Sequence, residues 1–207
     1  MTVYEAINAR RTIRDFDPKQ IENETIEKII SAGLKAPTND HMRSWEFVIV
    51  TKEKRAELLN ILPKTYTKSE VTQWLDTWSD DNVQRDMYLD GVPKQYTMLH
   101  DAGCLILPFY KEDDCLLKPE SLSSLNGFAS IWCCIENILI AAAAEGIFGV
   151  TRIPMEDEIE HIKTVVNHPA DYVMPCYIAL GYPAENASVP KQKNVSPKER
   201  IHFDVWI

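Results

Sequence analysis

Three arginines gather in a short stretch near the N-terminus, RRTIRDF, which spans residues 10–16. Arg10, Arg11 and Arg14 fall within five positions of a chain whose formal net charge is −9. Like charges this close repel one another, so an acidic protein gains nothing from such a cluster unless an anion binds there. Arginine suits that role because its planar fork of N–H donors matches carboxylate and phosphate oxygens. The stretch therefore predicts a local anion site.

A second interpretation of the arginines comes from the residues that precede them. Thr2 and Glu5 have the spacing of a capping box, which predicts a short helix beginning at Val3. Positive charge at the C-terminus of a helix is favourable, and that alone accounts for one or two of the arginines. Three of them, with Thr12 between, favour an anion site in addition.

Three further segments carry residues suited to binding. APTNDHMRSW, residues 36–45, is a polar loop before a predicted buried strand, where binding residues are common; a solvated connection is the alternative. EGIFGVTRIP, residues 145–154, contains Gly146, which suits a helix C-cap, and Gly149, which lets a ligand approach the backbone closely. PKQK, residues 190–193, places two lysines in the tail, where they bind an anion or are simply solvated.

Composition and charge exclude several classes of protein. Hydrophobic residues make up 45% and charged residues 26% of 207 residues, as in ordinary globular proteins. The sequence pI is about 5.1, and nucleic-acid binding needs a broad basic face, so we expect no nucleic-acid partner. No apolar signal segment follows the N-terminus, and Glu136, Asn137 and Glu145 interrupt the longest apolar run. We therefore expect no membrane span and a cytoplasmic location.

The five cysteines are odd in number and lack C-x-x-C spacing. This pattern predicts neither a metal site nor a disulfide framework. Cys133 and Cys134 lie in the apolar run, where we expect both to be small core residues.

The hydrophobic pattern predicts strands separated by helices within one domain, residues 1–207. Residues 63–100 are expected to form a helical excursion over the core, and residues 184–207 a C-terminal tail. The long helix from Leu125 to Glu145 is apolar nearly all round, so it is central or lies at a subunit interface. The remaining expected helices begin at Val3, Asn23 and Thr51, and the expected strands span 45–50, 104–110 and 173–183. Spacing alone leaves both α+β and α/β classes open.

Together and in this order, the segments resemble the flavin-dependent nitroreductase family over essentially the whole chain. RRTIRDF is similar to that family's R-R/S-S-x-R-x-F signature, and APTNDHMRSW to its A-P-S-x-x-N-x-Q-P-W segment. ENILIAAAAEGIFGV resembles its N-L-L-L-A-A-x-x-x-G-L-G-S helix and turn, and ALGYPAE with PKQK resembles its closing strand and basic pair. The resemblance implies an α+β, three-layer sandwich. Its central sheet is mixed but mostly antiparallel, helices flank it, and the long apolar helix lies at the interface of a homodimer.

In that family the anion is the cofactor FMN, and the resemblance assigns residues to it. Arg10, Lys191 and Lys193 would meet the phosphate, and Arg11 and Thr12 the ribityl region. Arg14 would face the N1 and C2 carbonyl edge of the flavin ring, where a fixed guanidinium stabilises the negative charge of the reduced form. Arg14 would thus tune the flavin, and no catalytic residue beyond the flavin and no metal is implied, because the cofactor carries the chemistry.

The loop and the turn are expected to supply the other cofactor contacts, and family members often supply this loop from the partner subunit. These contacts would come from Pro37, Thr38, Asn39, His41, Phe148 and Gly149. The chain departs from the family where His41, Arg43 and Ser44 replace Asn, Gln and Pro, and where Phe148 replaces Gly.

The resemblance implies an NAD(P)H-dependent flavin oxidoreductase. Electrons would pass from NAD(P)H through the flavin to a small acceptor, such as a nitroaromatic or a quinone, in a ping-pong sequence. Two alternatives stay open. The first is another reaction on the same fold, namely flavin destruction or reductive dehalogenation, and the second is a flavin-binding protein without turnover. Residues 63–100 are the segment expected to decide which reaction occurs.

Overall fold

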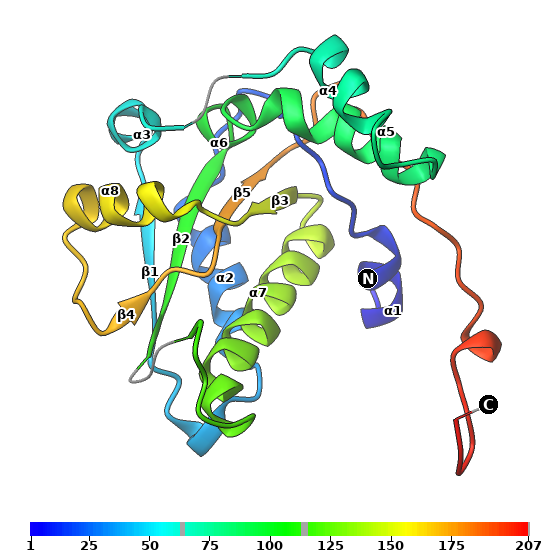
Figure 1. Cartoon of the computed structure of the whole chain (residues 1–207). Helices are drawn as coiled ribbons and strands as arrows, with labels where there is room; N and C mark the ends of the chain where they lie inside the picture. Colours follow the sequence, from blue (N-terminus) through cyan, green and yellow to red (C-terminus); the bar gives the residue numbers. More distant parts are fainter. Residues whose placement is uncertain (63–64, 113–115, 207) are drawn as a thin grey trace. The chain divides into compact units, whose positions relative to one another are not determined.

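The computed structural model of the chain describes residues 1–62, 65–112 and 116–206 (Figure 1). Cys115, residues 63–64 of the predicted excursion and Ile207 of the tail lie outside these ranges. The α-helices are α1 (Val3–Ala9), α2 (Asn23–Gly33), α3 (Lys52–Leu59), α4 (Lys68–Leu75), α5 (Asn82–Gly91), α6 (Thr97–His100), α7 (Asn126–Ala144) and α8 (Glu156–Val166). The strands are β1 (Trp45–Val50), β2 (Cys104–Lys111), β3 (Phe148–Arg152), β4 (Tyr172–Val173) and β5 (Tyr177–Gly181). Short 3-10 turns are η1 (Asn39–His41), η2 (Val92–Lys94), η3 (Ser123–Leu125) and η4 (Pro197–Glu199).

The central strand β2 explains why helices cover both faces of the sheet. Side chains alternate between the two faces of a strand. Cys104 and Ile106 belong to the core that includes α2 and α7, whereas Leu105 and Leu107 belong to the core that includes α3, α6 and α8. β2 is buried at every position except its last, Lys111, and it therefore carries a helical layer on each side (Figure 1). The predicted three-layer α+β sandwich is confirmed.

The sheet has the strand order β1-β2-β5-β3. The fifth strand, β4, lies off this path and pairs with β2. The described ladders are all antiparallel, including β1 with β2 and β3 with β5. A parallel contribution comes from one isolated bridge, which joins Thr12 to Gly149. The resemblance implied a mixed, mostly antiparallel sheet; the described strands form an antiparallel one, and the parallel bridge joins β3 to Thr12, which lies outside the strands.

The predicted strand 173–183 is two separate strands, so that expectation is corrected. β4 pairs Val173 with Tyr110, and β5 pairs Ile178 with Ile106, which shifts the register by one residue between the two pairings. Pro175 lies in the gap and has no N–H to donate to a ladder. The interruption follows from that missing donor.

Residues 145–154, interpreted from the sequence as a turn, contain the strand β3. Gly146 has φ 72°, and the Ile147 N–H donates to the Ala142 carbonyl at 2.9 Å, so the predicted glycine cap of α7 is confirmed. Gly149 lies three residues after Gly146, within β3. A Cβ there would collide with the carbonyl oxygen of Ala179 on β5. The space expected for a ligand on that side of Gly149 is thus occupied by the neighbouring strand.

Helix α7 packs into the core through one face and leaves another face open. Ile131, Cys134 and Ile138 are buried, whereas Cys133 is exposed, so the prediction of a core position is right for Cys134 and wrong for Cys133. Residues Ser123–Ala144 are long and apolar enough to cross a membrane by length and composition. The same composition suits a core helix, and α7 packs against α2 and the sheet.

The chain divides into two compact units. The first comprises Met1–Thr65 and Lys94–Val189, and contains the sheet. The second comprises Tyr66–Pro93 and Pro190–Ile207, so it joins most of the predicted excursion to the tail. Within the second unit, the Lys193 ammonium lies 2.9 Å from the Asp81 carboxylate at the start of α5.

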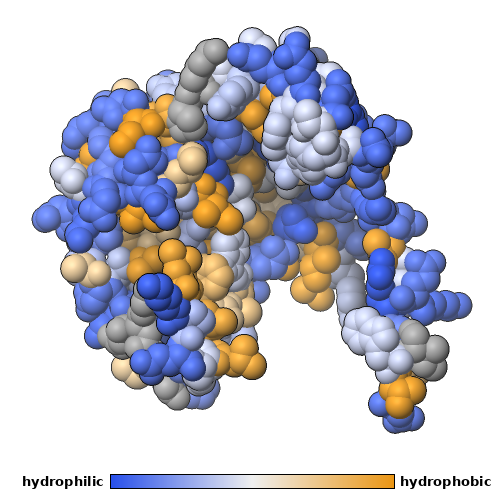
Figure 2. Space-filling model, viewed as in Figure 1, coloured by the Kyte–Doolittle hydropathy of each residue, from blue (hydrophilic) through white to orange (hydrophobic). Residues whose placement is uncertain are grey.

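Large apolar side chains reach the surface in both units (Figure 2). On α1, Val3 is 61% and Tyr4 is 76% exposed. In the tail, Phe203 is 80% and Trp206 is 91% exposed. Exposed apolar residues that cluster along one segment are typical of a surface that another protein covers.

The packing of Gly149 predicts a loss of stability when a methyl group is added. Gly149→Ala should lower the free energy of unfolding by about 1–3 kcal/mol, because the added Cβ has no room beside β5. Gly127→Ala is the matched control: its Cβ would make ordinary contact with Tyr110 at 3.4 Å, so it should be neutral or slightly stabilising. Urea denaturation measures both, and equal stabilities of the two variants would contradict the account.

Candidate functional site

The stretch RRTIRDF begins where the first helix ends. The Thr2 N–H donates to the Glu5 carboxylate at 2.6 Å, and the Glu5 N–H donates to the Thr2 hydroxyl at 3.3 Å, which confirms the predicted capping box. At the other end, the Arg10 N–H donates to the Ala6 carbonyl at 3.0 Å. Arg10 has φ −52° and ψ 129°, so the backbone leaves the helix at this residue.

The residues that follow are held against the end of the sheet. Thr12 bridges Gly149, and the Ile13 N–H donates to the Gly149 carbonyl at 3.3 Å. Ile13 is buried, and the Phe16 ring packs so closely on Gly181 that a Cβ there would lie 2.6 Å from it. These contacts fix the arginine stretch beside β3.

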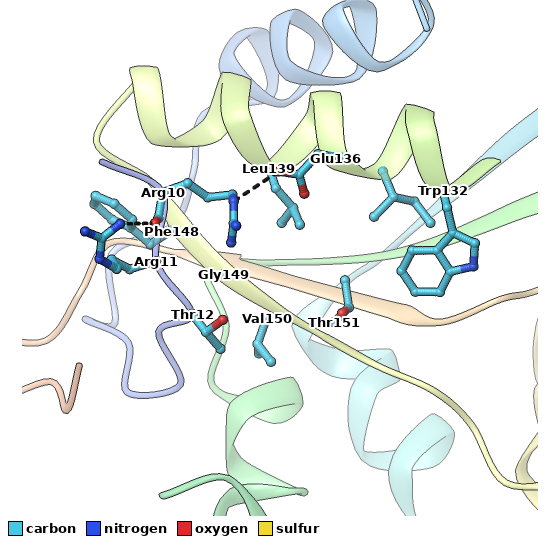
Figure 3. A pocket seen from close by; sticks show the side chains of 11 residues that line it. Arg10, Arg11, Thr12, Trp132, Glu136, Leu139, Phe148, Gly149, Val150 and Thr151 are labelled. Carbon is cyan, nitrogen blue, oxygen red and sulfur yellow. Dashed lines mark hydrogen bonds and ion pairs between the residues drawn. The ribbon is translucent and has the colours of Figure 1, made fainter. Parts of the chain in front are cut away.

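A cavity of about 280 Å³ lies between this stretch, β3 and α7 (Figure 3). Two arginines, two threonines and the Glu136 carboxylate line it together with aliphatic and aromatic side chains. The described lining residues are Arg10, Arg11, Thr12, Trp132, Ile135, Glu136, Leu139, Phe148, Gly149, Val150 and Thr151. The cavity therefore offers a cationic region beside an apolar wall.

Arg10 reaches into this cavity toward α7 (Figure 3). Its Nε lies 3.1 Å from the Glu136 Oε1, a distance that makes an ion pair. The same Nε is buried, and among the described residues it has no partner with hydrogen-bond geometry. Because both side chains are partly exposed, the pair contributes little to stability. Arg10 thus keeps donor capacity for another acceptor.

Arg11 serves mainly to close the first helix. Its Nη1 donates to the carbonyls of Asn8 and Arg10, each at 2.6 Å. This is the helix-end role that the sequence offered as the second interpretation of the arginines. Both arginines line the cavity, but Arg11 Nη1 is already bonded to backbone carbonyls near the end of α1, whereas Arg10 Nε is not.

The described residues that line this cavity do not include Arg14 or the predicted loop residues Pro37, Thr38, Asn39 and His41. Arg14 is half-buried two residues beyond Thr12. The Asn39 N–H donates to the Ser130 hydroxyl at 3.2 Å. Ser130 precedes Glu136 by six residues, which is about 9 Å along a helix.

Arg43, one of the departures from the family pattern, supports the loop that carries it. Its Nε donates to the Leu34 carbonyl at 3.0 Å, beyond the end of α2, and its Nη1 donates to the His41 carbonyl at 3.3 Å. His41 and Arg43 have φ values of 56° and 47°, so this loop is held in an uncommon backbone conformation. The sequence did not indicate this role.

Lys191 and Lys193 lie in the second unit and are exposed. The Gln84 N–H and the Lys193 ammonium hold the pKa of the Asp81 carboxyl below its usual value. Lys193 thus has an acidic partner within its own unit, whereas Arg10 pairs with Glu136 in the first.

Several lining residues were missed from the sequence, and helical spacing was the signal that could have found them. Trp132, Ile135, Glu136 and Leu139 follow one another at intervals of three, one and three, which places them on one face of α7. The face was hidden because the whole helix is apolar. Val150 and Thr151 were missed because β3 itself was not predicted.

A buried ion pair holds the far end of β3. Arg152 donates to both carboxylate oxygens of Glu158 on α8, at 2.5 and 2.6 Å. The Tyr177 hydroxyl donates to the same carboxylate at 3.2 Å, and Arg152 Nε donates to Gln95 at 2.7 Å. Burial, followed by the Glu158 carboxylate, raises the pKa of Tyr177. The strand that forms the cavity floor is thereby tied to α8.

The donor set defines the kind of ligand that fits. The buried Arg10 Nε–H lacks a hydrogen-bond partner in the described structure, and the opposite wall is apolar. A ligand with an anionic end and an apolar ring satisfies both regions, and FMN has both. Within residues 1–62, 65–112 and 116–206, no group of three or more His, Cys, Asp or Glu side chains is placed to hold a metal ion.

The fold is a three-layer α+β sandwich, and its cavity beside an N-terminal arginine suits such an amphipathic, anionic ligand. The chain belongs to the nitroreductase family: the model described as "Nitroreductase family" matches residues 7–182.

Three similar proteins illustrate the relationship. A "Putative NADH dehydrogenase/NAD(P)H nitroreductase" of Methanothermobacter thermautotrophicus is 26% identical over 100% of this chain and 88% of that protein. An iodotyrosine deiodinase of Haliscomenobacter hydrossis is 26% identical over 90% of this chain and 82% of that protein. A crystal structure of oxidized iodotyrosine deiodinase bound to FMN and 3-iodo-L-tyrosine has a TM-score of 0.71 and 17% identity, and covers 99% of this chain and 100% of that chain. The fold prediction is confirmed, and the predicted cofactor, FMN, is the one bound in that crystal structure.

The buried pair at the end of β3 generates a stability prediction. Glu158→Ala should lower the free energy of unfolding by about 3–5 kcal/mol, because it leaves the buried Arg152 guanidinium without its carboxylate. Glu156→Ala, at an exposed position of the same helix, should change it by less than about 0.5 kcal/mol. Denaturant unfolding of both variants measures the difference, and a loss below about 1 kcal/mol for Glu158→Ala would argue against a structural role for the pair.

Proposed function

We propose that this chain is an FMN-dependent oxidoreductase that takes electrons from NAD(P)H and passes them to a small acceptor. The observation that carries the proposal is the Arg10 guanidinium in the cavity beside β3, with a buried Nε–H that lacks a hydrogen-bond partner among the described residues. The apolar wall opposite suits a flavin ring. Membership of the nitroreductase family also supports an FMN-dependent oxidoreductase.

The chain's own residues would bind and tune the cofactor. Arg10 binds the phosphate as a charge-assisted donor, and Thr12 offers its hydroxyl to the ribityl chain. Arg14 acts at the N1 and C2 carbonyl edge of the ring, where its charge favours the reduced form. FMN, when bound, supplies the two-electron chemistry, which is why the site needs no nucleophile of its own. Lys191 and Lys193 stay predicted phosphate contacts.

The working form is a homodimer. The cavity of about 280 Å³ is slightly below the range of about 300–1,000 Å³ typical of ligand sites, which supports completion by a second copy. Exposed Val3 and Tyr4 on α1, which packs on α7, offer an apolar surface for that copy. Residues 36–41 would then be supplied across the interface. The acidic charge balance supports a protein without nucleic-acid partners. We also expect no membrane partner and a cytoplasmic location.

Reductive dehalogenation is the second candidate reaction. Iodotyrosine deiodinases are among the relatives at 26% identity, and their name specifies the removal of iodine from an iodotyrosine. In that reaction the substrate takes up two electrons and one proton. Its carbon–iodine bond breaks, a carbon–hydrogen bond forms, and iodide is released. The aromatic residues Trp74, Trp78 and Tyr88, whose rings pack 5.1–5.4 Å apart in the second unit, lie in the segment expected to select the acceptor.

The test begins with the purified protein. It should be yellow, and heat should release FMN, not FAD. Double-reciprocal plots of the initial rate of NAD(P)H oxidation, at several fixed quinone concentrations, should then give the parallel lines of a ping-pong sequence. Release of iodide from 3-iodotyrosine, without quinone reduction, would select the second candidate. Bound FMN without turnover of either acceptor would leave a flavin-binding protein, and absence of flavin binding would overturn the proposal.

The phosphate assignment predicts an order of effects among the basic residues. Arg10→Ala should weaken FMN binding by about 10- to 150-fold, because a charge-assisted contact contributes about 1.5–3 kcal/mol. Lys193→Ala should weaken it by less than about fivefold, because Lys193 is exposed and already pairs with Asp81. Titration of the apoproteins with FMN measures both constants, and equal losses would count against Arg10 as the main phosphate ligand.

The proposed position of Arg14 predicts a shift in reduction potential. Arg14→Gln should lower the two-electron midpoint potential by about 30–65 mV, because the lost contact of about 1.5–3 kcal/mol falls on the reduced form. Oxidised FMN should still bind. A dye-equilibration titration of wild type and variant measures the shift, with Lys193→Ala as a control of unchanged potential. An Arg14→Gln potential equal to that of wild type would remove Arg14 from the flavin edge.

A further inference from the structure

Glu136 is a carboxylate inside a cavity proposed to receive an anion. It projects from the middle of α7, and its Oε1 lies 3.1 Å from Arg10 Nε (Figure 3). A negative side chain beside a phosphate site repels the phosphate, so its presence needs an explanation. Two roles are open to it: it either orients Arg10 for the ligand or competes with the ligand for Arg10.

Two arginine–glutamate pairs among the described residues of the first unit show the difference between these roles. Arg152 donates two directed hydrogen bonds to Glu158, and the Glu158 side chain is 0% exposed. Arg10 makes no hydrogen bond of that kind, because its Nε is buried without a partner of suitable geometry in the described residues. A carboxylate that fixes a guanidinium accepts directed bonds from it, as Glu158 does. Glu136 does not meet that condition.

Glu136 also has the freedom to leave. Its side chain is 49% exposed, and within the described part of the chain it is bound by no hydrogen bond. A half-exposed ion pair is weak, so rotation of the glutamate toward solvent costs little. The phosphate of a nucleotide can then take its place beside Arg10 with better geometry.

We infer that Glu136 is an internal competitor that pairs with Arg10 in the cofactor-free protein and must release it when the phosphate binds. Glu136 is thus a residue that limits affinity for the phosphate end of the ligand. It also offsets one of the two positive charges that line the cavity, those of Arg10 and Arg11, before the cofactor arrives, which disfavours binding of small anions such as inorganic phosphate. The inference rests on the proposed FMN site.

The test compares ligands with and without the phosphate. FMN and riboflavin share the same ring and differ in that group, so the apoprotein is titrated with each by quenching of flavin fluorescence. Glu136→Gln should lower the dissociation constant for FMN by about two- to fivefold, the range expected for a half-exposed ion pair. Riboflavin affinity should not change. Inorganic phosphate should also compete with FMN more strongly in this variant.

Glu145→Gln is the matched control. It removes the same charge at the end of the same helix, but Glu145 pairs with Lys28 at 2.7 Å and does not line the cavity. Its FMN affinity should equal that of wild type. Glu136→Ala supplies a second variant, since alanine is well tolerated in a helix, and should tighten FMN binding in the same direction.

A double variant tests whether the effect passes through Arg10. In an Arg10→Gln background, the gain from Glu136→Gln should disappear. A gain that persists there would indicate direct repulsion and overturn competition for Arg10. Weaker or unchanged FMN binding by Glu136→Gln, or an equal change for riboflavin, also overturns the inference while leaving the FMN site intact. Absence of FMN binding by wild type would end both the proposed function and the inference.

Discussion

The close approach of β3 to β5 is the constraint on which the candidate site depends. It requires glycine at position 149, because any side chain there would collide with the Ala179 carbonyl. With β3 in this place, the Gly149 carbonyl accepts the Ile13 N–H, and Thr12 forms its bridge. The arginine stretch is thereby held by backbone contacts, which do not depend on the charges of its side chains. The Arg10 side chain is not needed to hold the stretch, and its only ion pair with the described residues is with Glu136.

Two ion pairs along β3 differ in burial and in hydrogen bonding, and we assign them different roles. The Arg152–Glu158 pair is buried and doubly hydrogen-bonded, so it fixes the strand to α8 at a high cost for removal of either partner. The Arg10–Glu136 pair lies in a cavity, is partly exposed and lacks hydrogen-bond geometry. The first kind of pair suits a scaffold, and the second suits a site where one anion is exchanged for another.

Local signals predicted much of this fold. The capping box of α1, the apolar strands 45–50 and 104–110, and the glycine cap of α7 follow from residues close together in sequence. β3 was missed because it is short and contains Gly149, whose role depends on a strand about 30 residues later. The Arg10–Glu136 pair joins residues 126 positions apart, which no local pattern encodes. The arginines were identified as an anion site, but their division between Arg10 and the helix-capping Arg11 needed the packed structure.

The central claim is that Arg10 receives the phosphate of FMN beside β3. A crystal structure of the protein with FMN tests it most directly, through the contacts of the Arg10 guanidinium. The account predicts a phosphate oxygen within hydrogen-bond distance of that guanidinium, about 2.7–2.9 Å, with Glu136 moved beyond about 4 Å. A phosphate bound elsewhere, with Arg10 still paired to Glu136, would contradict it.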